Sequence, residues 1–413
     1  MNFAPSEEAL LLVASVRRFV EEELCPLEEE VESKGVLESC KAREILLKSR
    51  DLGFYAMNMP EDVGGGGLSA VEMCLVAQEM GRTSDILVRR AFGTVYELLL
   101  ECEGQQRDEW LFPAVRGDRT CAIAMTEPGA GSDPAGIQTT ATPDGDGWTL
   151  NGGKHFVSDG AFSDFFAVTA RTDPDAGPKG ISVFLVDKTM PGVTVGRNQS
   201  MMGLRGGSHV ELSFDGVKLS SKHLLGEPGR GLRLILGTIG RVRLFDIGAR
   251  AVGTATLLLE MMTRHARVRR QFGVPIGEFQ MIQSQLADSA VEIASARLLC
   301  LEAAWETDEG LDPREKVSMV KVCSSETLGR VADRAVQVFG GLGYCKDLPI
   351  ERIYRDCRVM RIYDGTSEIH RGVVARGCCE EERLPCCRTE SRSTDQAVGG
   401  CELVLPAQGT LGP

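Results

Sequence analysis

Hydrophobic and polar positions follow a helical period over the first quarter of the chain. From Ser6 onward, apolar side chains recur every three to four positions and so share one face of a helix. The same spacing predicts helices at 42–52, 69–80 and 86–102. Four consecutive glycines at 64–67 interrupt it. They indicate a plain flexible loop, or else a loop kept small so that a ligand can pass close to the backbone; the pattern favours the first.

Near Cys121 the period shortens to that of strands. Short runs rich in β-branched and aromatic residues occur at 148–150, 155–157, 165–169 and 181–186. Asp-Gly and Asn-Gly sequences at 144–147 and 151–153 predict hairpin turns between them. We therefore predict a β domain at 119–225.

The helical period returns at Gly226 and persists to about Gly377. It predicts long helices at 232–269, 280–307 and 313–339. Helices, then strands, then helices indicate an α+β multidomain protein and exclude a βαβ alternation. The predicted domains are an N-terminal helical domain at 1–118, the β domain at 119–225 and a C-terminal helical domain at 226–377. The remaining residues, 378–413, lack a period, so we expect a disordered tail.

Composition and charge narrow the classes of partner. Hydrophobic residues make up 43% and charged residues 25% of the chain, as in soluble globular proteins. A formal net charge of −13 argues against nucleic acid as the main partner. No run of 18 apolar residues is free of charges, so no membrane span is expected. We expect a cytoplasmic location in a bacterium, or a mitochondrial or peroxisomal matrix location in a eukaryote, although no targeting signal is evident.

Cysteine and histidine spacing predicts no metal site. The 14 cysteines include no C-x-x-C pair, and the five histidines are widely separated. We expect the nine cysteines before the tail to be reduced thiols. The paired cysteines of the tail could bind metal or carry lipid, but neither has the spacing that such sites use.

Three stretches suggest ligand binding, although each could instead be an ordinary turn or helix cap. Residues 124–136 form a Gly-rich loop with Ser and Thr that could approach a phosphorylated or planar ligand, or be a bare turn. Residues 269–276 could hold a diphosphate or end a helix with a basic turn. Residues 337–344 could receive adenine or ribose, or cap a helix.

Together with residues 363–371, and in this order, these stretches closely resemble the motifs of the acyl-CoA dehydrogenase family of flavoproteins. The resemblance extends from the N-terminal helices to about Arg376. It implies a helical N-terminal domain, a middle β-barrel domain and a C-terminal four-helix bundle. It also implies FAD as cofactor, an acyl-CoA substrate, an electron-transfer flavoprotein as acceptor, and a homo-oligomer, either a dimer or a tetramer.

The resemblance assigns roles to individual residues. Those implied to contact FAD within one subunit are Met125, Thr126, Ser132, Phe156, Val157, Ser158, Thr366 and Glu368. Those implied to hold the diphosphate and adenine of a neighbouring subunit's FAD are Arg269, Phe272, Gln280, Gln337, Gly340 and Gly341. Those implied to contact substrate are Ser132, Arg241, Arg243 and Gly365.

Asp364 falls on the catalytic base of the family, where most members carry Glu. A thioester acidifies the α-hydrogen, so the implied reaction removes that proton to Asp364 while the β-hydride passes to flavin N5, giving a trans-2-enoyl-CoA. Asp loses roughly 1.5 Å of reach relative to Glu. Some members take the base from the helix that carries Arg243, but arginine cannot serve. Two alternatives remain open: an acyl-CoA or nitroalkane oxidase of the same fold, and a catalytically idle flavin-binding protein.

Overall fold

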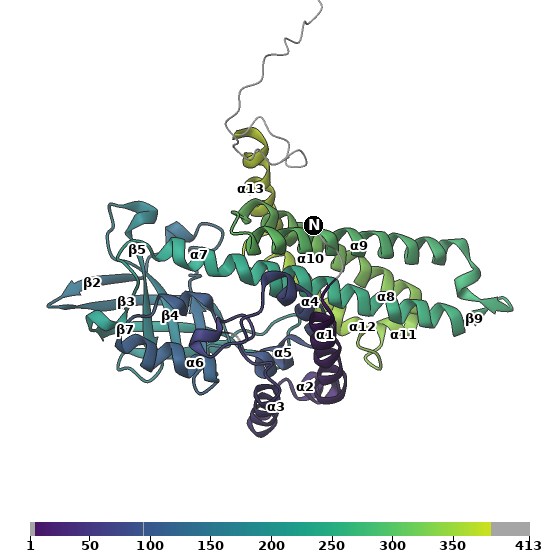
Figure 1. Ribbon diagram of the computed structural model, residues 1–413, viewed down its shortest axis with the longest axis horizontal. Coiled ribbons are helices and arrows are strands. Elements are labelled where there is room, and N and C mark those ends of the chain that lie inside the picture. The colour runs from purple at the N-terminus through teal and green to yellow at the C-terminus, as the bar shows by residue number, and fades with distance from the viewer. Residues whose placement is uncertain (1–4, 94, 381–413) are drawn as a thin grey trace, which may run out of the picture. The chain divides into compact units, whose positions relative to one another are not determined.

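The computed structural model describes residues 5–93 and 95–380 (Figure 1). Contacts divide the chain into two units, Met1–Val374 and Ala375–Pro413. The first unit contains the fold discussed below. Of the predicted tail at 378–413, residues 378–380 lie in the last helix and the rest lies outside the described residues.

Among the described residues, the N-terminal part of the first unit contains six α-helices. They are α1 (Glu7–Phe19), α2 (Glu28–Lys34), α3 (Ser39–Asp51), α4 (Ala70–Met80), α5 (Asp85–Phe92) and α6 (Phe112–Arg116). A capping box fixes the start of α4, because Ser69 and Glu72 each accept from the other's backbone N–H. The helix predicted at 86–102 was wrong: α5 ends at Gly93, whose φ of +78° is left-handed and breaks the helix.

The four-glycine stretch is packed against its own chain. A Cβ at Gly65 would lie 2.2 Å from the carbonyl oxygen of Met59, and one at Gly66 would lie 2.9 Å from Cα of Met57. The backbone N–H of Gly66 donates to Ala56 and that of Gly67 to Met59. Glycine is therefore required for a close approach of two backbone segments, and the expectation of a plain flexible loop was wrong.

Eight strands form one sheet in the middle of the sequence. They are β1 (Cys121–Ala124), β2 (Thr140–Asp144), β3 (Gly147–Ser158), β4 (Phe165–Arg171), β5 (Ile181–Asp187), β6 (Val193–Asn198), β7 (His209–Leu219) and β8 (Leu224–Leu225). Their order is β6-β7-β3-β2-β4-β5-β8, and β1 pairs in parallel with β4. The turn at 144–147 joins β2 to β3 as predicted.

The hairpin turn predicted at 151–153 was wrong, because these residues lie inside β3. Pairing between β3 and β7 shifts register between Leu150 and Gly152, which marks a bulge. Gly152 has a φ of +139°, and a Cβ there would lie 2.6 Å from the Thr139 hydroxyl oxygen. An Asn-Gly pair serves a bulge as well as a turn, so the local sequence does not separate the two.

Helices dominate the last part of the unit, and α8, α9 and α10 are the long ones. The helices are α7 (Gly231–Val242), α8 (Arg250–Val268), α9 (Gln280–Asp308), α10 (Arg314–Phe339), α11 (Gly341–Tyr344), α12 (Ile350–Cys357) and α13 (Ser367–Glu380), which begins in this unit. A π-helical turn, Arg243–Ala249, joins α7 to α8, and the short hairpin β9 (Arg270–Gln271) and β10 (Val274–Pro275) joins α8 to α9. Figure 1 shows α8, α9 and α10 running side by side, and all three pairs are in contact.

Buried side chains connect the three parts of the fold. One core cluster joins α1, α4 and α5 to α8, α9, α10 and α12. A second joins α6 and the turn before it to β1, β4, β5 and α7, and a third fills the interior of the sheet. The N-terminal helices thus pack on both the sheet and the long helices. Among the described residues, no helix is long and apolar enough to cross a membrane.

Candidate active site

The loop before α13 carries Asp364 in a left-handed conformation. Asp364 has a φ of +52° and Gly365 a φ of +93°. Glycine is needed at 365, since a Cβ there would lie 2.7 Å from Nε2 of His370. Asp is one of the few residues with a side chain that enters this backbone region at modest cost.

Three side chains hold the backbone of this loop. The carbonyl oxygen of Asp364 accepts from Nε of Arg243 at 2.7 Å and from Nε2 of His370 at 3.1 Å. The carbonyl oxygen of Gly365 accepts from Nζ of Lys321. Within the described part of the chain, the Asp364 carboxylate itself has no hydrogen-bond partner. Its backbone is therefore fixed while its carboxylate stays available.

Burial raises the pKa of Asp364. The positive charges of Arg243, Arg89 and Lys321 oppose this rise, and the negative charge of Asp246 adds to it. Burial also lowers the pKa of Lys321 to about 8 and that of His370 to about 4, so His370 is neutral near pH 7. A partly desolvated carboxylate with a raised pKa is suited to accept a proton.

The Gly-rich loop after β1 rests on a buried ion pair. Nζ of Lys154 lies 2.6 Å from Oε1 of Glu127, and both side chains are almost fully buried. Glu127 also accepts from the backbone N–H groups of Gln138 and Thr139. This buried ion pair holds the loop to the sheet, while Ser132 and its neighbouring glycines remain exposed.

Met125 and Thr126 begin the same loop and are partly buried. The carbonyl oxygen of Thr126 accepts from the backbone N–H of His155, at 2.7 Å. This bond ties the start of the loop to β3. It places two of the predicted FAD-contacting stretches side by side, at 125–132 and 156–158.

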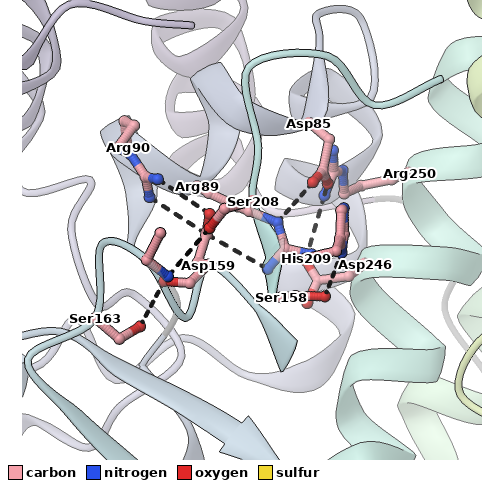
Figure 2. A network of polar contacts seen from close by, with 11 residues as sticks. Asp85, Arg89, Arg90, Ser158, Asp159, Ser163, Ser208, His209, Asp246 and Arg250 are labelled. Atoms are coloured by element: carbon pink, nitrogen blue, oxygen red, sulfur yellow. Dashed lines mark hydrogen bonds and ion pairs between the residues drawn. The ribbon is translucent and has the colours of Figure 1, made fainter. Parts of the chain in front are cut away.

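The end of β3 presents Phe156 and Ser158. Phe156 has a φ of +56°, stacks on His155 with ring centroids 3.9 Å apart, and is 51% exposed. Oγ of Ser158 lies 3.1 Å from Nδ1 of His209 (Figure 2). Val157, predicted to line the same wall, has its side chain in the interior of the sheet, so only its backbone faces outward.

The residues predicted to hold a neighbouring subunit's FAD are all on the surface. Phe272 is 94% exposed with a φ of +52°, in the hairpin between α8 and α9. Gly340 has a φ of +59°, and a Cβ at Gly340 or Gly341 would meet nothing within 4 Å. The others in this group, Arg269, Gln280 and Gln337, are also exposed.

Thr366 and Glu368 lie at the start of α13. Oγ1 of Thr366 accepts from the backbone N–H of Ile369 at 3.2 Å, as an N-cap does. Glu368 is exposed, and the hydrogen bonds that it accepts lower its pKa. Both side chains follow directly on Asp364 and Gly365.

A cavity of about 70 Å³ lies between α5 and the α7–α8 helix. Arg241 is exposed and contributes to its wall. Arg243, predicted with Arg241 to contact the substrate, donates from Nε to the carbonyl oxygen of Asp364. The cavity wall also includes Arg89 and Asp246, whose charges act on the pKa of Asp364.

A polar network adjoins this cavity, and three of its members, Arg89, Asp246 and Arg250, line the cavity wall (Figure 2). Asp85 accepts from Nε of Arg89 at 2.6 Å and from Nη1 of Arg250 at 2.9 Å. Asp246 lies 3.9 Å from Arg250, and Asp159 lies 3.8 Å from Arg89. The network joins α5, the sheet and α8, three segments that are far apart in the sequence.

Sequence reasoning missed several of these residues. Glu127 and His370 lie inside the motifs at 124–136 and 363–371 but were given no role there. Lys321, Lys154 and His209, the partner of Ser158, belong to no motif. Their role depends on tertiary packing alone. The cavity residues Arg89, Asp246 and Arg250 gave one usable signal, a series of charges within otherwise apolar helices.

Comparison with known proteins covers nearly the whole chain. Family models for the N-terminal, middle and C-terminal domains of acyl-CoA dehydrogenase match residues 6–118, 122–217 and 229–379. The 3-(aryl)acrylate reductase of Clostridium sporogenes is 35% identical over 90% of this chain and 98% of its own. The mitochondrial short-chain specific acyl-CoA dehydrogenase of Homo sapiens is 34% identical over 88% of each chain. The structure of butyryl-CoA dehydrogenase from Megasphaera elsdenii superposes with a TM-score of 0.85 at 30% identity, covering 92% of this chain and all of the other.

Proposed function

Since the chain belongs to the acyl-CoA dehydrogenase family of FAD-dependent oxidoreductases, we propose that it oxidises an acyl-CoA thioester to the trans-2-enoyl-CoA, with Asp364 as the base. The observation that carries this proposal is the state of Asp364. Arg243 and His370 fix its backbone, and Lys321 fixes that of Gly365. Its carboxylate is partly buried and has no hydrogen-bond partner within the described residues, and burial raises its pKa.

The residues around the Gly-rich loop fit FAD. The exposed Gly129 and Gly131 leave open space where a Cβ would be, so a ligand can approach the backbone. Phe156 presents an exposed ring beside this loop, and Ser158 presents a hydroxyl. When bound, FAD supplies the two-electron acceptor for the β-hydride of the substrate.

The chain's own residues then position the proton transfer. Asp364 removes the α-proton, and Arg243 and His370 keep its backbone in place. Both donate to the same carbonyl oxygen, so the left-handed turn is held from two sides. We assign the polar part of the substrate to Arg241, and its exposure at the cavity supports this assignment.

We infer further that the enzyme is a homo-oligomer and passes its electrons to an electron-transfer flavoprotein. Support for the oligomer comes from large apolar side chains exposed on the long helices and their connections. They include Val268, Phe272, Met281, Val291, Leu298 and Tyr344, each more than half exposed. This surface adjoins the exposed residues that the family resemblance assigns to a neighbouring subunit's FAD.

Anaerobic flavin bleaching tests the proposal. Purified protein should be yellow, and its flavin should lose absorbance with acyl-CoAs from a panel of straight, branched and cyclic chains. Asp364→Ala should lower the bleaching rate by at least about 100-fold, as expected for loss of a general base. Because burial raises the pKa of Asp364 and the base acts deprotonated, the wild-type rate should rise with pH through that pKa.

Protein that binds FAD but is not bleached by any acyl-CoA would contradict the proposal. So would an Asp364→Ala variant that is as fast as the wild type. Peroxide release under air at the rate of bleaching would identify an oxidase instead.

A further inference from the structure

The side chain of Lys154 is buried where the Gly-rich loop meets the sheet. Its ammonium group has three hydrogen-bond acceptors: Oε1 of Glu127 at 2.6 Å, the carbonyl oxygen of Met125 at 3.2 Å and Oγ1 of Thr169 at 3.2 Å. Three acceptors match the three N–H donors of an ammonium group. Two of them belong to the loop and the third to β4, so this residue of β3 joins the loop to two strands.

The ion pair that Lys154 forms with Glu127 is buried and charged. Their side chains are 0% and 5% exposed. Burial lowers the pKa of Lys154 to about 8, so the ammonium form still predominates at pH 7. Removing an ion pair from water costs several kcal/mol per ion, and apolar side chains in the same space are often as stable or more stable. Stability alone therefore does not account for this pair.

Glu127 ties the two ends of the loop together. Its carboxylate accepts from the backbone N–H groups of Gln138 at 2.6 Å and Thr139 at 3.0 Å. Burial raises the pKa of Glu127, but its hydrogen bonds and the charge of Lys154 outweigh burial and bring the pKa below its ordinary value. The loop is therefore closed on the same ionised carboxylate that Lys154 binds.

Neighbouring residues of β3 hold neighbouring residues of the loop. Lys154 binds the two loop residues on either side of Thr126, whose carbonyl oxygen accepts from the backbone N–H of His155 at 2.7 Å. The β3 residues that follow, 156–158, are those proposed to face FAD. The contacts of Lys154 therefore fix the spacing between that part of β3 and the loop at 125–132.

We propose that Lys154 is a positioning residue for the flavin, which through the Met125 carbonyl oxygen holds the loop at 125–132 against residues 156–158 so that both contact FAD. This inference rests on the proposed function and adds to it a residue that the FAD-contacting motifs do not include. The Lys154 side chain is fully buried beneath the loop, so it acts through Met125 and Glu127 and not by touching FAD or substrate.

Two variants separate positioning from stability. Lys154→Met keeps the length of the side chain but leaves the Glu127 carboxylate buried without its cation, so both stability and FAD affinity should fall. Lys154→Met combined with Glu127→Gln removes both charges, so stability should return close to that of the wild type. FAD affinity in this double variant should stay at least about tenfold weaker, because the Met125 carbonyl oxygen still lacks its charged donor.

Three measurements on the full chain report these effects. Dilution of the FAD-loaded protein and the fluorescence of released FAD measure affinity, and denaturant unfolding without FAD measures stability. The visible absorbance of FAD-saturated protein reports the surroundings of the flavin. Its bands should shift in both variants, whereas a loss of stability alone reduces the amount of folded protein without shifting them.

Lys218→Met is the matched control. Lys218 lies on β7 of the same sheet, is paired with Asp144 at 2.6 Å, and has a side chain that is 73% exposed. The substitution removes the same charge from the sheet without touching the loop. FAD affinity and the flavin spectrum should both remain those of the wild type.

The outcomes are distinct. A double variant with wild-type FAD affinity and an unshifted spectrum overturns the inference, since the ion pair would then serve only the fold. If the double variant stays unstable, its spectrum at saturating FAD decides: shifted bands support the inference and unshifted bands overturn it. Wild-type protein that holds no FAD counts against the proposed function itself.

Discussion

Individual residues in this site work through backbone atoms and neighbouring side chains as much as through their own chemistry. Ser158 illustrates this. Its hydroxyl, proposed to face FAD, lies 3.1 Å from Nδ1 of the buried His209. Burial lowers the pKa of His209, so the ring is neutral near pH 7 and keeps one nitrogen free to accept. The Ser158 hydroxyl is therefore held in one orientation.

Replacing His209 should weaken FAD binding in a way that depends on the new side chain. His209→Ala removes one hydrogen bond, worth about 1 kcal/mol, so FAD should bind roughly five-fold more weakly and the visible flavin spectrum should shift. His209→Asn places an amide near the Ser158 hydroxyl and should restore most of the affinity. Titrating apoprotein with FAD measures both. Equal loss in the two variants would show that His209 acts only through its volume.

At the scale of elements, the contact between α4 and α8 is made by glycines. A Cβ at Gly253 would lie 1.8 Å from the carbonyl oxygen of Gln78, and one at Gly81 would lie 2.2 Å from that of Arg250. The two helices therefore meet backbone to backbone. Arg250, next to this contact, holds the network beside the cavity, so helix packing and site geometry are coupled.

Gly253→Ala should lower the free energy of unfolding by about 3 kcal/mol, the upper end for overpacking, because backbone atoms on both sides prevent relaxation. Gly237→Ala is the matched control. Gly237 lies on α7, and a methyl group added there would meet nothing within 4 Å, so alanine should be neutral or stabilising by up to about 1 kcal/mol. Denaturant unfolding measures both. A Gly253→Ala variant as stable as the wild type would mean that α4 and α8 separate easily.

At the scale of the whole molecule, the exposed apolar surface of the long helices is the proposed interface of the homo-oligomer. Met281 and Val291 on α9 are 76% and 67% exposed. Single exposed apolar residues are common, but several along neighbouring elements indicate a surface that another protein covers. A second copy of this chain is the proposed occupant.

Met281→Asp combined with Val291→Asp should shift the protein to a smaller species, because two carboxylates would be buried in the interface. Light scattering after size-exclusion chromatography measures the mass. Leu52→Asp, at a position that is 57% exposed after α3, should leave the mass unchanged. A double variant with the mass of the wild type would place the interface elsewhere.

The sequence alone predicted the order of helical, β and helical sections, because hydrophobic periodicity and turn residues are local properties of the chain. It misplaced features that depend on contact with distant segments. The glycines at 64–67 and the Asn-Gly pair at 151–152 suggested a flexible loop and a turn, and tertiary contact made them a packed segment and a bulge. The site followed the same division. Asp364 and His370 stood in one motif, but the bond of His370 to the Asp364 carbonyl oxygen, and the support from Lys321 outside any motif, could be found only in the fold.

The π-helical turn Arg243–Ala249 changes how this helix should be aligned with others. A π-turn holds more residues than an α-turn, so the segment from Gly231 to Val268 accommodates additional sequence without lengthening. An alignment to a relative with a regular helix therefore requires a gap within the turn. Without that gap, the residues on one side of the turn are paired with the wrong columns, and a helical wheel drawn at a constant 100° turns the side chains within the turn, such as Asp246, to the wrong face.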